Sequence, residues 1–253
     1  RGDRHMTLIA HASIDEKGTA KNGQAGDQTK KEVCTRTWYN KPWNAVIRFK
    51  DAGKREKIAQ LMEKAAANDM IGYDQNQRNT LLTQARKFNY DVSKVTEPCE
   101  TDCSALVTLA CIYAGIPESK LIHNGNSATT RTLVPLLKAT GEVEVITLPL
   151  YTQRTDKLVR GDILIKEGSH VVVVVQVDKN NPYFITDRLL KRGSYGESVK
   201  WLQFQLVALN GAILNIDGVF GEQTEKAVIK YQEAKGLEVD GIAGEQTIKS
   251  LGG

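Results

Sequence analysis

The chain has 253 residues, of which 41% are hydrophobic and 25% are charged. This length and composition are typical of a folded protein with one large domain or two smaller ones. The 34 Lys and Arg residues exceed the 30 Asp and Glu residues, for a net charge of +4. No apolar run approaches the roughly eighteen residues of a membrane span, and no basic helix carries interleaved aromatic residues. We therefore expect neither membrane insertion nor nucleic-acid binding.

The N-terminus points to synthesis in the cytoplasm. Arg1 to His5 resemble a leftover from an expression vector, which makes Met6 the expected native start. Nothing after Met6 resembles a secretory signal, so we expect the protein to be made without a signal peptide. If the substrate lies outside the cell, another factor must let the protein through.

Residues 7–50 combine glycines with polar residues and are expected to be mostly loop. Asp27 and Gln28 are suited to cap a short helix over residues 29–33. An aromatic cluster follows at residues 38–43. It either packs in the core or lines a binding cleft, and the sequence leaves both open.

Hydrophobic periodicity predicts helices in the first half of the chain and buried strands further on. Helices followed by antiparallel strands are typical of an α+β domain. The predicted helices span residues 51–70, 76–88 and 129–139, and the predicted strands span residues 142–148, 158–165 and 170–177.

A further helix is predicted to begin at Cys103 behind the N-cap residue Asp102 and to end at Gly115. Free backbone N–H groups and the helix dipole in the first turn favour a thiolate, the reactive form of cysteine. Taken alone, Cys103 could equally be an inert buried cysteine. Cys111, deeper in the same apolar run, is expected to pack in the core.

His170 is the one histidine at the edge of a predicted strand. An imidazole held in place can accept a thiol proton and later return it to a leaving amine. The Cys99-x-x-x-Cys103 spacing is poor for a metal site, so no metal or cofactor is expected, and without a secretory signal no disulfide framework is expected either. The remaining histidines are His5 and His11, in the unpatterned N-terminus, and His123, in a polar loop.

Three motifs resemble those of the NlpC/P60 and CHAP group of papain-like cysteine peptidases, which cut peptide or amide bonds in bacterial cell walls. The usual pattern is Asp-Cys-Ser-Gly-Leu-Val, then Pro-Gly-Asp, then Gly-His-Val. Ala105, Arg160 and Ser169 depart from it without touching the reacting groups. The resemblance covers about residues 90–187. Its motifs are Asp102-Cys103-Ser104-x-Leu106-Val107, Arg160-Gly161-Asp162-x-Leu164 and Ser169-His170-Val171.

The resemblance implies a papain-like N-terminal domain in which Cys103 is the nucleophile and His170 the general base and acid. Papain-like enzymes often stabilise the oxyanion with a glutamine, a role open to Gln28 if it is more than a cap. Further candidates for the oxyanion site or the cleft are Asp102, Ser104 and Trp43.

Strand geometry suggests the third catalytic group. If a turn at residues 178–181 sends residues 183–187 back antiparallel to residues 170–177, Val172 pairs with Asp187. Asp187 would then lie on the face of His170, about 7–8 Å away along the diagonal. We predict that Asp187 orients the His170 imidazole.

An internal repeat follows Asp187. Its two copies are Asp217-Gly-Val-Phe-Gly-Glu-Gln-Thr224 and Asp240-Gly-Ile-Ala-Gly-Glu-Gln-Thr247. Each combines a glycine turn with the start of a helix. Residues 189–251 resemble the three-helix peptidoglycan-binding domain, although a purely structural module is an alternative.

These observations together predict a papain-like catalytic domain at residues 6–187 and a peptidoglycan-binding domain at residues 188–253. The second segment is neutral, so the net charge of +4 belongs to the first, which suits an anionic polymer such as the cell wall. The predicted protein is an endolysin of phage or prophage origin, assumed monomeric, that reaches bacterial peptidoglycan after holin-type release. It would cut a peptide bond of the stem or cross-bridge. The alternatives are an N-acetylmuramoyl-L-alanine amidase with the same dyad and an inert wall-binding protein.

Overall fold

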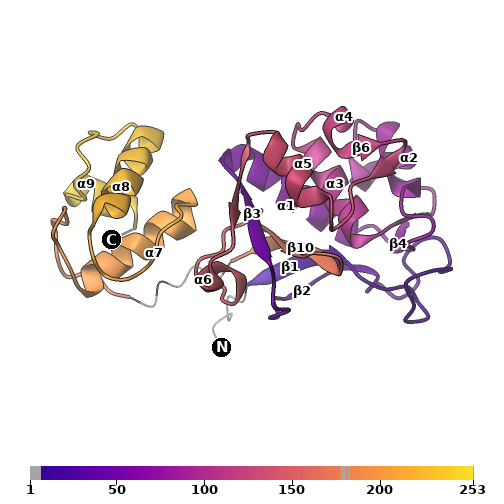
Figure 1. The fold of residues 1–253 in the computed structure, drawn as a ribbon, viewed down its shortest axis with the longest axis horizontal. Helices are drawn as coiled ribbons and strands as arrows, with labels where there is room; N and C mark the ends of the chain where they lie inside the picture. The colour runs from indigo at the N-terminus through magenta and orange to yellow at the C-terminus, as the bar shows by residue number, and fades with distance from the viewer. Residues whose placement is uncertain (1–6, 178–180, 182, 253) are drawn as a thin grey trace.

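The computed structural model describes residues 7–177, 181 and 183–252. A sheet with helices packed on it forms the larger part of the molecule, and helices α7, α8 and α9 form a separate body beside it (Figure 1). The predicted native start, Met6, lies outside the described residues. No helix in the described part of the chain is long and apolar enough to cross a membrane.

The sheet of the larger part has six antiparallel strands in the order β2-β1-β10-β9-β3-β8. Its central strand β10 pairs with β1 on one side and with β9 on the other. The strands are β1 (Leu8–Ala12), β2 (Val33–Thr37), β3 (Ala45–Phe49), β8 (Val143–Ile146), β9 (Ile163–Lys166) and β10 (His170–Gln176).

One face of the sheet is covered by α1 (Ala52–Ala66) and α3 (Cys103–Tyr113). Burial follows the predicted helical spacing: α1 turns Ile58, Leu61, Met62 and Ala65 into the core. The smaller elements on this side are α2 (Thr80–Arg86), a 3₁₀ turn (Val92–Lys94), α4 (Glu118–Leu121), α5 (Leu133–Ala139) and the short strands β4 (Ile71–Tyr73), β5 (Cys99–Thr101), β6 (Ile122–His123) and β7 (Asn126–Ser127).

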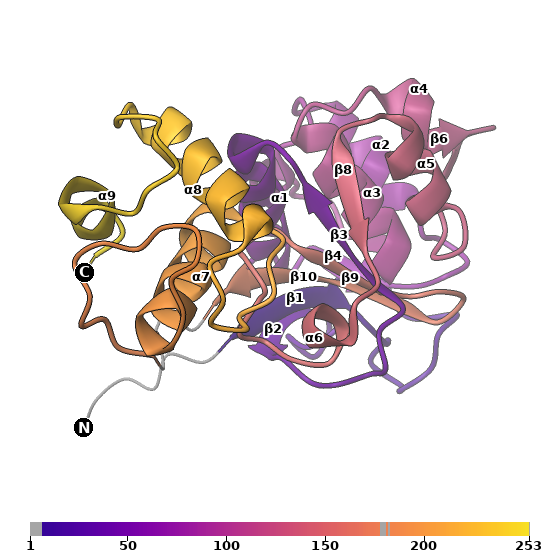
Figure 2. The ribbon, with the colours of Figure 1, turned by 60° about the vertical axis from the view of Figure 1, so that its left-hand side comes forward.

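The opposite face of the sheet carries a second, smaller apolar cluster that includes Trp43, Leu164, Val172 and Tyr151. Tyr151 belongs to the short helix α6 (Pro149–Thr152), which lies below the sheet in Figure 2. Alternate residues of β10 enter the two clusters, as expected for a strand buried on both faces. β10 therefore lies between the two apolar clusters, and its first residue, His170, is buried.

The C-terminal body consists of α7 (Glu197–Asn210), α8 (Glu222–Lys235) and α9 (Glu245–Ser250) around their own apolar cluster. The sequence repeat forms the same hydrogen-bond network twice. In the first copy the buried Gln203 amide donates to Asp217 Oδ1 and Thr224 Oγ1 and accepts from Gly218 N–H. In the second copy Gln232 makes the corresponding bonds to Asp240, Thr247 and Gly241.

The mixed α/β architecture with an antiparallel sheet, followed by a helical region, agrees with the predicted class. Several local predictions are wrong. Residues 7–50, expected to be mostly loop, contain the strands β1, β2 and β3, which form half of the sheet. Residues 29–33 form no helix, because β2 begins at Val33 and Asp27 accepts backbone N–H groups in an irregular loop. Residues 183–187 form no strand along β10, because both edges of β10 are already paired.

Candidate functional site

Cys103 is the first residue of α3, as predicted, and its side chain is buried. Asp102 caps the helix by accepting the backbone N–H of Ala105 at 2.7 Å. Such a cap contributes about 1 kcal/mol to helix stability. The predicted start of the helix at Cys103 is confirmed.

A network around Asp102 fixes this helix start in place. The guanidinium of Arg78 donates to both carboxylate oxygens of Asp102, at 2.5 and 3.1 Å, and to the hydroxyl of Ser104 at 2.9 Å. Ser104 in turn donates to Asp102. Asp102 and Ser104, predicted as oxyanion or cleft residues, have their polar atoms engaged in this network. They fix the position of the helix start to which Cys103 belongs.

Burial raises the pKa of the Cys103 thiol to about 12, and the neighbouring Asp102 carboxylate adds to the rise. The backbone N–H groups of Val171 and Ser104 act in the opposite direction because they stabilise the thiolate. The contact with Val171 is the link to the sheet. It places the Cys103 sulfur against the peptide group that joins His170 to Val171.

His170 is the first residue of β10, and its Nε2 atom lies 2.9 Å from Nδ1 of His11. His11 belongs to β1, the strand paired with β10, and both imidazoles are buried. The expectation that His11 lies in an unpatterned segment is therefore wrong. Among the hydrogen bonds of the described residues, none joins the Cys103 sulfur to the His170 ring, and His170 Nδ1 has no partner.

The two imidazoles are uncharged at neutral pH. Burial, with smaller effects from the nearby cations Arg36 and Lys41, lowers the pKa of His11 to about 4. Burial and the His11 ring, with the same two cations, lower the pKa of His170 to about 3. In the neutral pair one ring nitrogen donates and the other accepts. The resting site thus holds a thiol and a neutral imidazole.

Aromatic side chains surround the histidine pair. The ring of Trp43 stacks on His170 with 6.3 Å between centroids, and its Nε1 donates to the backbone oxygen of Tyr39. Burial raises the pKa of both Tyr39 and Tyr73, and a smaller rise from the charge of a Cys103 thiolate indicates that both phenols lie near Cys103. Trp43 is buried in the apolar cluster on the second face of the sheet, so it packs in the core and contacts His170 from there. Tyr73 gave no signal in the sequence.

The structure does not bring Gln28 or Asp187 to the histidine pair. Gln28 is exposed, and its side-chain amide donates to the backbone oxygens of its own loop, Ala25 and Gly26. Asp187 donates its backbone N–H to the hydroxyl of Ser198 in α7. The argument for Asp187 required the return strand that does not form, so its predicted role loses its geometric basis.

The Arg160-Gly161-Asp162 motif has a structural role. Asp162 is fully buried and accepts a two-pronged bond from Arg48, at 2.7 and 2.6 Å. Gly161 has φ +86°, and a Cβ there would lie 2.3 Å from the backbone oxygen of Arg55, so only glycine fits. Arg160, where the motif usually has proline, pairs with two glutamates of α1, Glu56 and Glu63.

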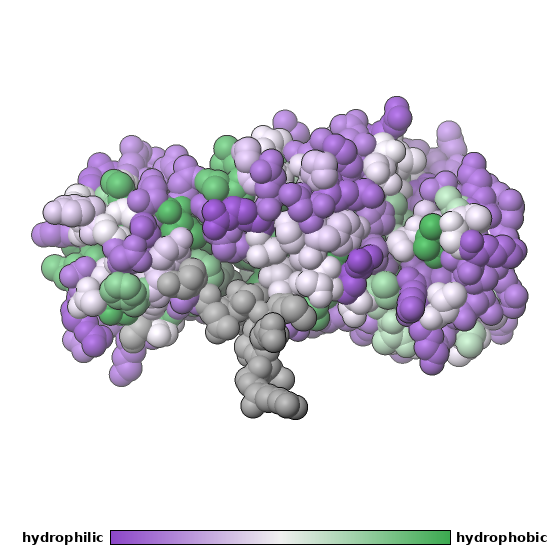
Figure 3. Space-filling model, turned by 90° about the horizontal axis from the view of Figure 1, so that it is seen from below, coloured by the Kyte–Doolittle hydropathy of each residue, from purple (hydrophilic) through white to green (hydrophobic). Residues whose placement is uncertain are grey.

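The described residues contain no group of three or more His, Cys, Asp or Glu side chains that could hold a metal ion. The four cysteines are free thiols. On the face of the molecule seen in Figure 3, hydrophilic residues predominate and apolar ones form small separate patches. The candidate site therefore consists of a cysteine at the start of α3 and a pair of buried histidines on β1 and β10.

Comparisons with known proteins address the two parts of the chain separately. A family model described as an endolysin-like domain matches residues 9–181, and one described as a peptidoglycan binding domain matches residues 195–251. A search of the curated proteins finds no match.

Solved structures match only parts of the chain. The SleB N-terminal domain is 38% identical over 27% of this chain and 93% of its own, with a TM-score of 0.26. The endolysin of Burkholderia AP3 phage is 41% identical over 26% of this chain and 25% of its own, with a TM-score of 0.25. A peptidoglycan-binding protein from Clostridioides difficile is 25% identical over 36% of this chain and 70% of its own, with a TM-score of 0.26.

These TM-scores are too low to support any argument about the fold, so the family models carry the assignment. The endolysin-like model spans well over half of the sequence and includes Cys103, His170 and His11. The chain therefore belongs to the endolysin-like domain family and carries a peptidoglycan-binding domain behind it.

Proposed function

We propose that the protein is a peptidoglycan hydrolase that cuts a peptide bond of the wall stem or cross-bridge by cysteine catalysis. The observation that carries the proposal is the start of β10. There the Cys103 sulfur meets the 170–171 peptide group, and the His170 ring is held by His11. A thiol beside a held imidazole is the pair that nucleophilic acyl transfer needs. The papain-like character of the domain is part of this proposal.

The proposed first step moves a proton before the thiol attacks. His170 Nδ1, which has no other partner among the described residues, accepts the proton of the Cys103 thiol. The thiolate then adds to the scissile carbonyl, and backbone N–H groups at the start of α3, that of Cys103 among them, receive the oxyanion. When the C–N bond breaks, His170 returns the proton to the leaving amine. Water, deprotonated by the same imidazole, releases the acyl group from Cys103.

We propose that His11, in place of Asp187, orients the base. If Nδ1 of His170 accepts the thiol proton, Nε2 must carry the other proton and donate it to Nδ1 of His11. This hydrogen bond selects the productive tautomer of His170. His11 Nδ1 also accepts a hydrogen bond from the His170 imidazolium that forms during the reaction. The arrangement corresponds to the carboxylate–histidine pairing of other triads, with a neutral acceptor. Because the acceptor is neutral, it favours the imidazolium less than a carboxylate would.

The C-terminal domain supplies attachment. A module that binds the wall keeps the catalytic domain at high local concentration on its substrate, which is an effect of tethering. Because the net charge of this domain is zero, the long-range electrostatic attraction to an anionic wall comes from the rest of the chain.

The experiment is mass spectrometry of fragments released from purified peptidoglycan, with Cys103→Ala as the control. Split cross-bridges or shortened stems are expected from the wild type, and nothing from the variant. Free stems with an intact L-alanine amine would identify the amidase, which the same dyad could serve. No fragments from walls of several bacteria, together with retained wall binding, would replace the enzyme with an inert wall-binding protein.

A further inference from the structure

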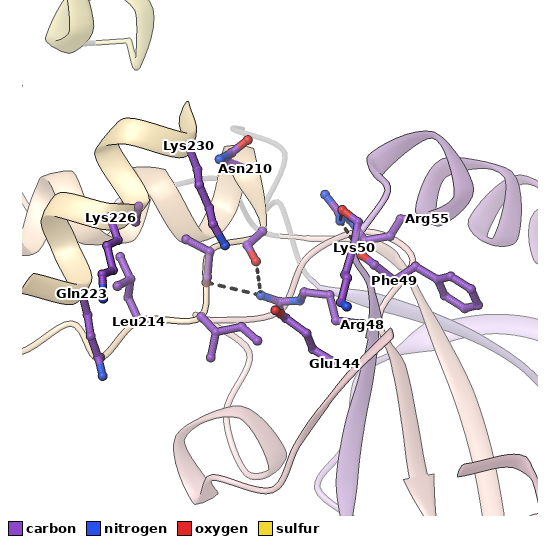
Figure 4. A pocket seen from close by; sticks show the side chains of 14 residues that line it. Arg48, Phe49, Lys50, Arg55, Glu144, Asn210, Leu214, Gln223, Lys226 and Lys230 are labelled. Atoms are coloured by element: carbon purple, nitrogen blue, oxygen red, sulfur yellow. Dashed lines mark hydrogen bonds between the residues drawn. The ribbon is translucent and has the colours of Figure 1, made fainter. Parts of the chain in front are cut away.

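A cleft of about 740 Å³ lies between the two parts of the molecule, away from Cys103. Figure 4 shows its two walls: Lys226 and Lys230 from α8 on one side, and Arg48 and Lys50 from the end of β3 on the other. His170 lies near the opposite end of β3, since Ala45 pairs with Ile165 and Ile165 with Val171. The five-residue length of β3 separates the two places by roughly 15 Å.

The segment after α7 forms the floor of the cleft and joins the two parts. Arg48 donates to the backbone oxygen of Gly211 at 3.0 Å, and the Tyr151 hydroxyl exchanges hydrogen bonds with the backbone of Leu214. The charge of Arg48 is balanced by the buried Asp162. Arg48 therefore acts as a structural anchor, and the other cations determine the charge of the cleft.

Those cations outnumber the acids that line the cleft. Arg55 is only 8% exposed, and its described hydrogen bonds go to the backbone oxygens of Phe49 and Lys50. Burial, with repulsion from Arg48, lowers the pKa of Arg55, although attraction to Asp162, Asp51 and Glu144 acts in the opposite direction. Among the ion pairs of the described residues, none involves Arg55, Lys50 or Lys230.

Few acidic residues offset the positive charge of the cleft. Lys226 pairs with the exposed Glu222, a surface contact worth little. Glu144 is the one acid among the residues that line the cleft in the described structure. A cavity with several uncompensated cations attracts an anion, and a low-dielectric wall around Arg55 strengthens the attraction.

We propose that this interdomain cleft binds a free carboxylate of a peptidoglycan stem peptide. The identity of the polymer rests on the proposed function and on the family model that covers α8. Lys226 and Lys230 on one wall and Lys50 on the other can each form a charge-assisted hydrogen bond with a carboxylate, and the buried Arg55 adds positive charge to the same cleft. One bound carboxylate would then contact both parts of the molecule. It would bind the wall and fix the orientation of the catalytic domain relative to its anchor.

The test uses the full chain with Cys103→Ala, so that the probe is not digested. The probe is a soluble disaccharide-free stem peptide with free carboxylates, and its amidated form is the comparison. The Lys226→Gln, Lys230→Gln double variant should bind the free-acid peptide about tenfold more weakly, with a smaller salt dependence. Lys249→Gln, an exposed lysine of α9 outside the cleft, is the matched control and should bind like the parent.

Equal binding by the double variant and the Lys249→Gln control would overturn the proposal. So would equal binding of the free-acid and amidated peptides, or binding of a glycerol-phosphate polymer in place of the peptide. Thermal unfolding of both variants checks that the fold is intact. Hydrolysis by the wild type is measured separately, so loss of peptide binding with intact hydrolysis would refute only the cleft. Peptide binding without any hydrolysis would refute only the proposed function.

Discussion

The two parts of the molecule assemble their key contacts over different distances along the chain. In the C-terminal domain each buried glutamine, Gln203 or Gln232, bonds to a turn and a helix start within 21 residues of it. In the N-terminal part of the molecule the bond between His11 and His170 spans 159 residues. A local network leaves a repeat that can be read in the sequence. A site formed by strand pairing leaves no such pattern.

The largest expected effect is a loss of hydrolysis without a loss of wall binding. Cys103→Ala should lower peptidoglycan hydrolysis by about 10³-fold or more, because the nucleophile is removed. Sedimentation with insoluble wall should show unchanged binding, since the C-terminal domain is untouched. Turbidity of a wall suspension measures the first quantity. Loss of both properties together would mean that the variant is misfolded or that the two parts do not act separately.

His11→Ala tests the long-range contact. Without its acceptor, His170 can adopt the wrong tautomer or orientation, and kcat should fall about 10- to 100-fold while KM changes little. His11→Gln, which keeps an acceptor, should recover part of the loss. A rise in KM with an unchanged kcat would contradict the positioning role. Gln28→Ala serves as the comparison and should have little effect, because the Gln28 amide bonds only within its loop.

Gln203→Ala tests the local network. It leaves the Gly218 N–H group and the Thr224 hydroxyl without their buried partner, which should destabilise the C-terminal domain by about 2 kcal/mol. Wall binding should fall, and hydrolysis of a soluble stem fragment should persist. Urea unfolding monitored by Trp201 fluorescence measures the change. Gln246→Ala, on the exposed surface of α9, should change nothing.

The pH dependence of stability tests the histidine pair. Both folded-state pKa values lie below the ordinary value of 6.5, so the unfolded chain binds more protons between pH 6.5 and about 4. Stability should therefore be fully present above pH 6.5 and fall as the pH drops, by about 1.4 kcal/mol per histidine for each pH unit below 6.5. Urea unfolding at pH 7 and pH 5.5 measures the slope. His11→Gln should flatten it, and an unchanged slope would argue against a neutral buried pair.

Local signals predicted much of the fold. The cap at Asp102 and the apolar run behind it located the start of α3, and the spacing of Ile58, Leu61 and Met62 located α1. The short apolar run Leu8–Ala12, interrupted only by His11, could have indicated a buried strand. Five residues beside a glycine-rich segment are a weak signal. No feature of the sequence shows that this segment pairs with β10.

The failed prediction for Asp187 has a different physical cause. The hairpin argument assumed that the strand after β10 would be its neighbour, because consecutive strands often pair. The N-terminal strand β1 takes that edge instead, and residues Tyr183 and Ile185 pack against the C-terminal apolar cluster. The competition between two chain segments for one strand edge is decided by tertiary packing. The residue that occupies the predicted position of Asp187 is then His11.

The most direct test of catalysis by Cys103 is digestion of purified peptidoglycan in the presence of hydroxylamine, with mass spectrometry of the released fragments. An acyl group bound to the Cys103 sulfur would be attacked by the hydroxylamine nitrogen, and the thiolate would leave. Hydroxamate-terminated fragments should therefore appear beside the ordinary acids, and neither should form with Cys103→Ala. Fragments that carry only ordinary carboxylates, or hydroxamates that persist in Cys103→Ala, would contradict an acyl-enzyme on Cys103.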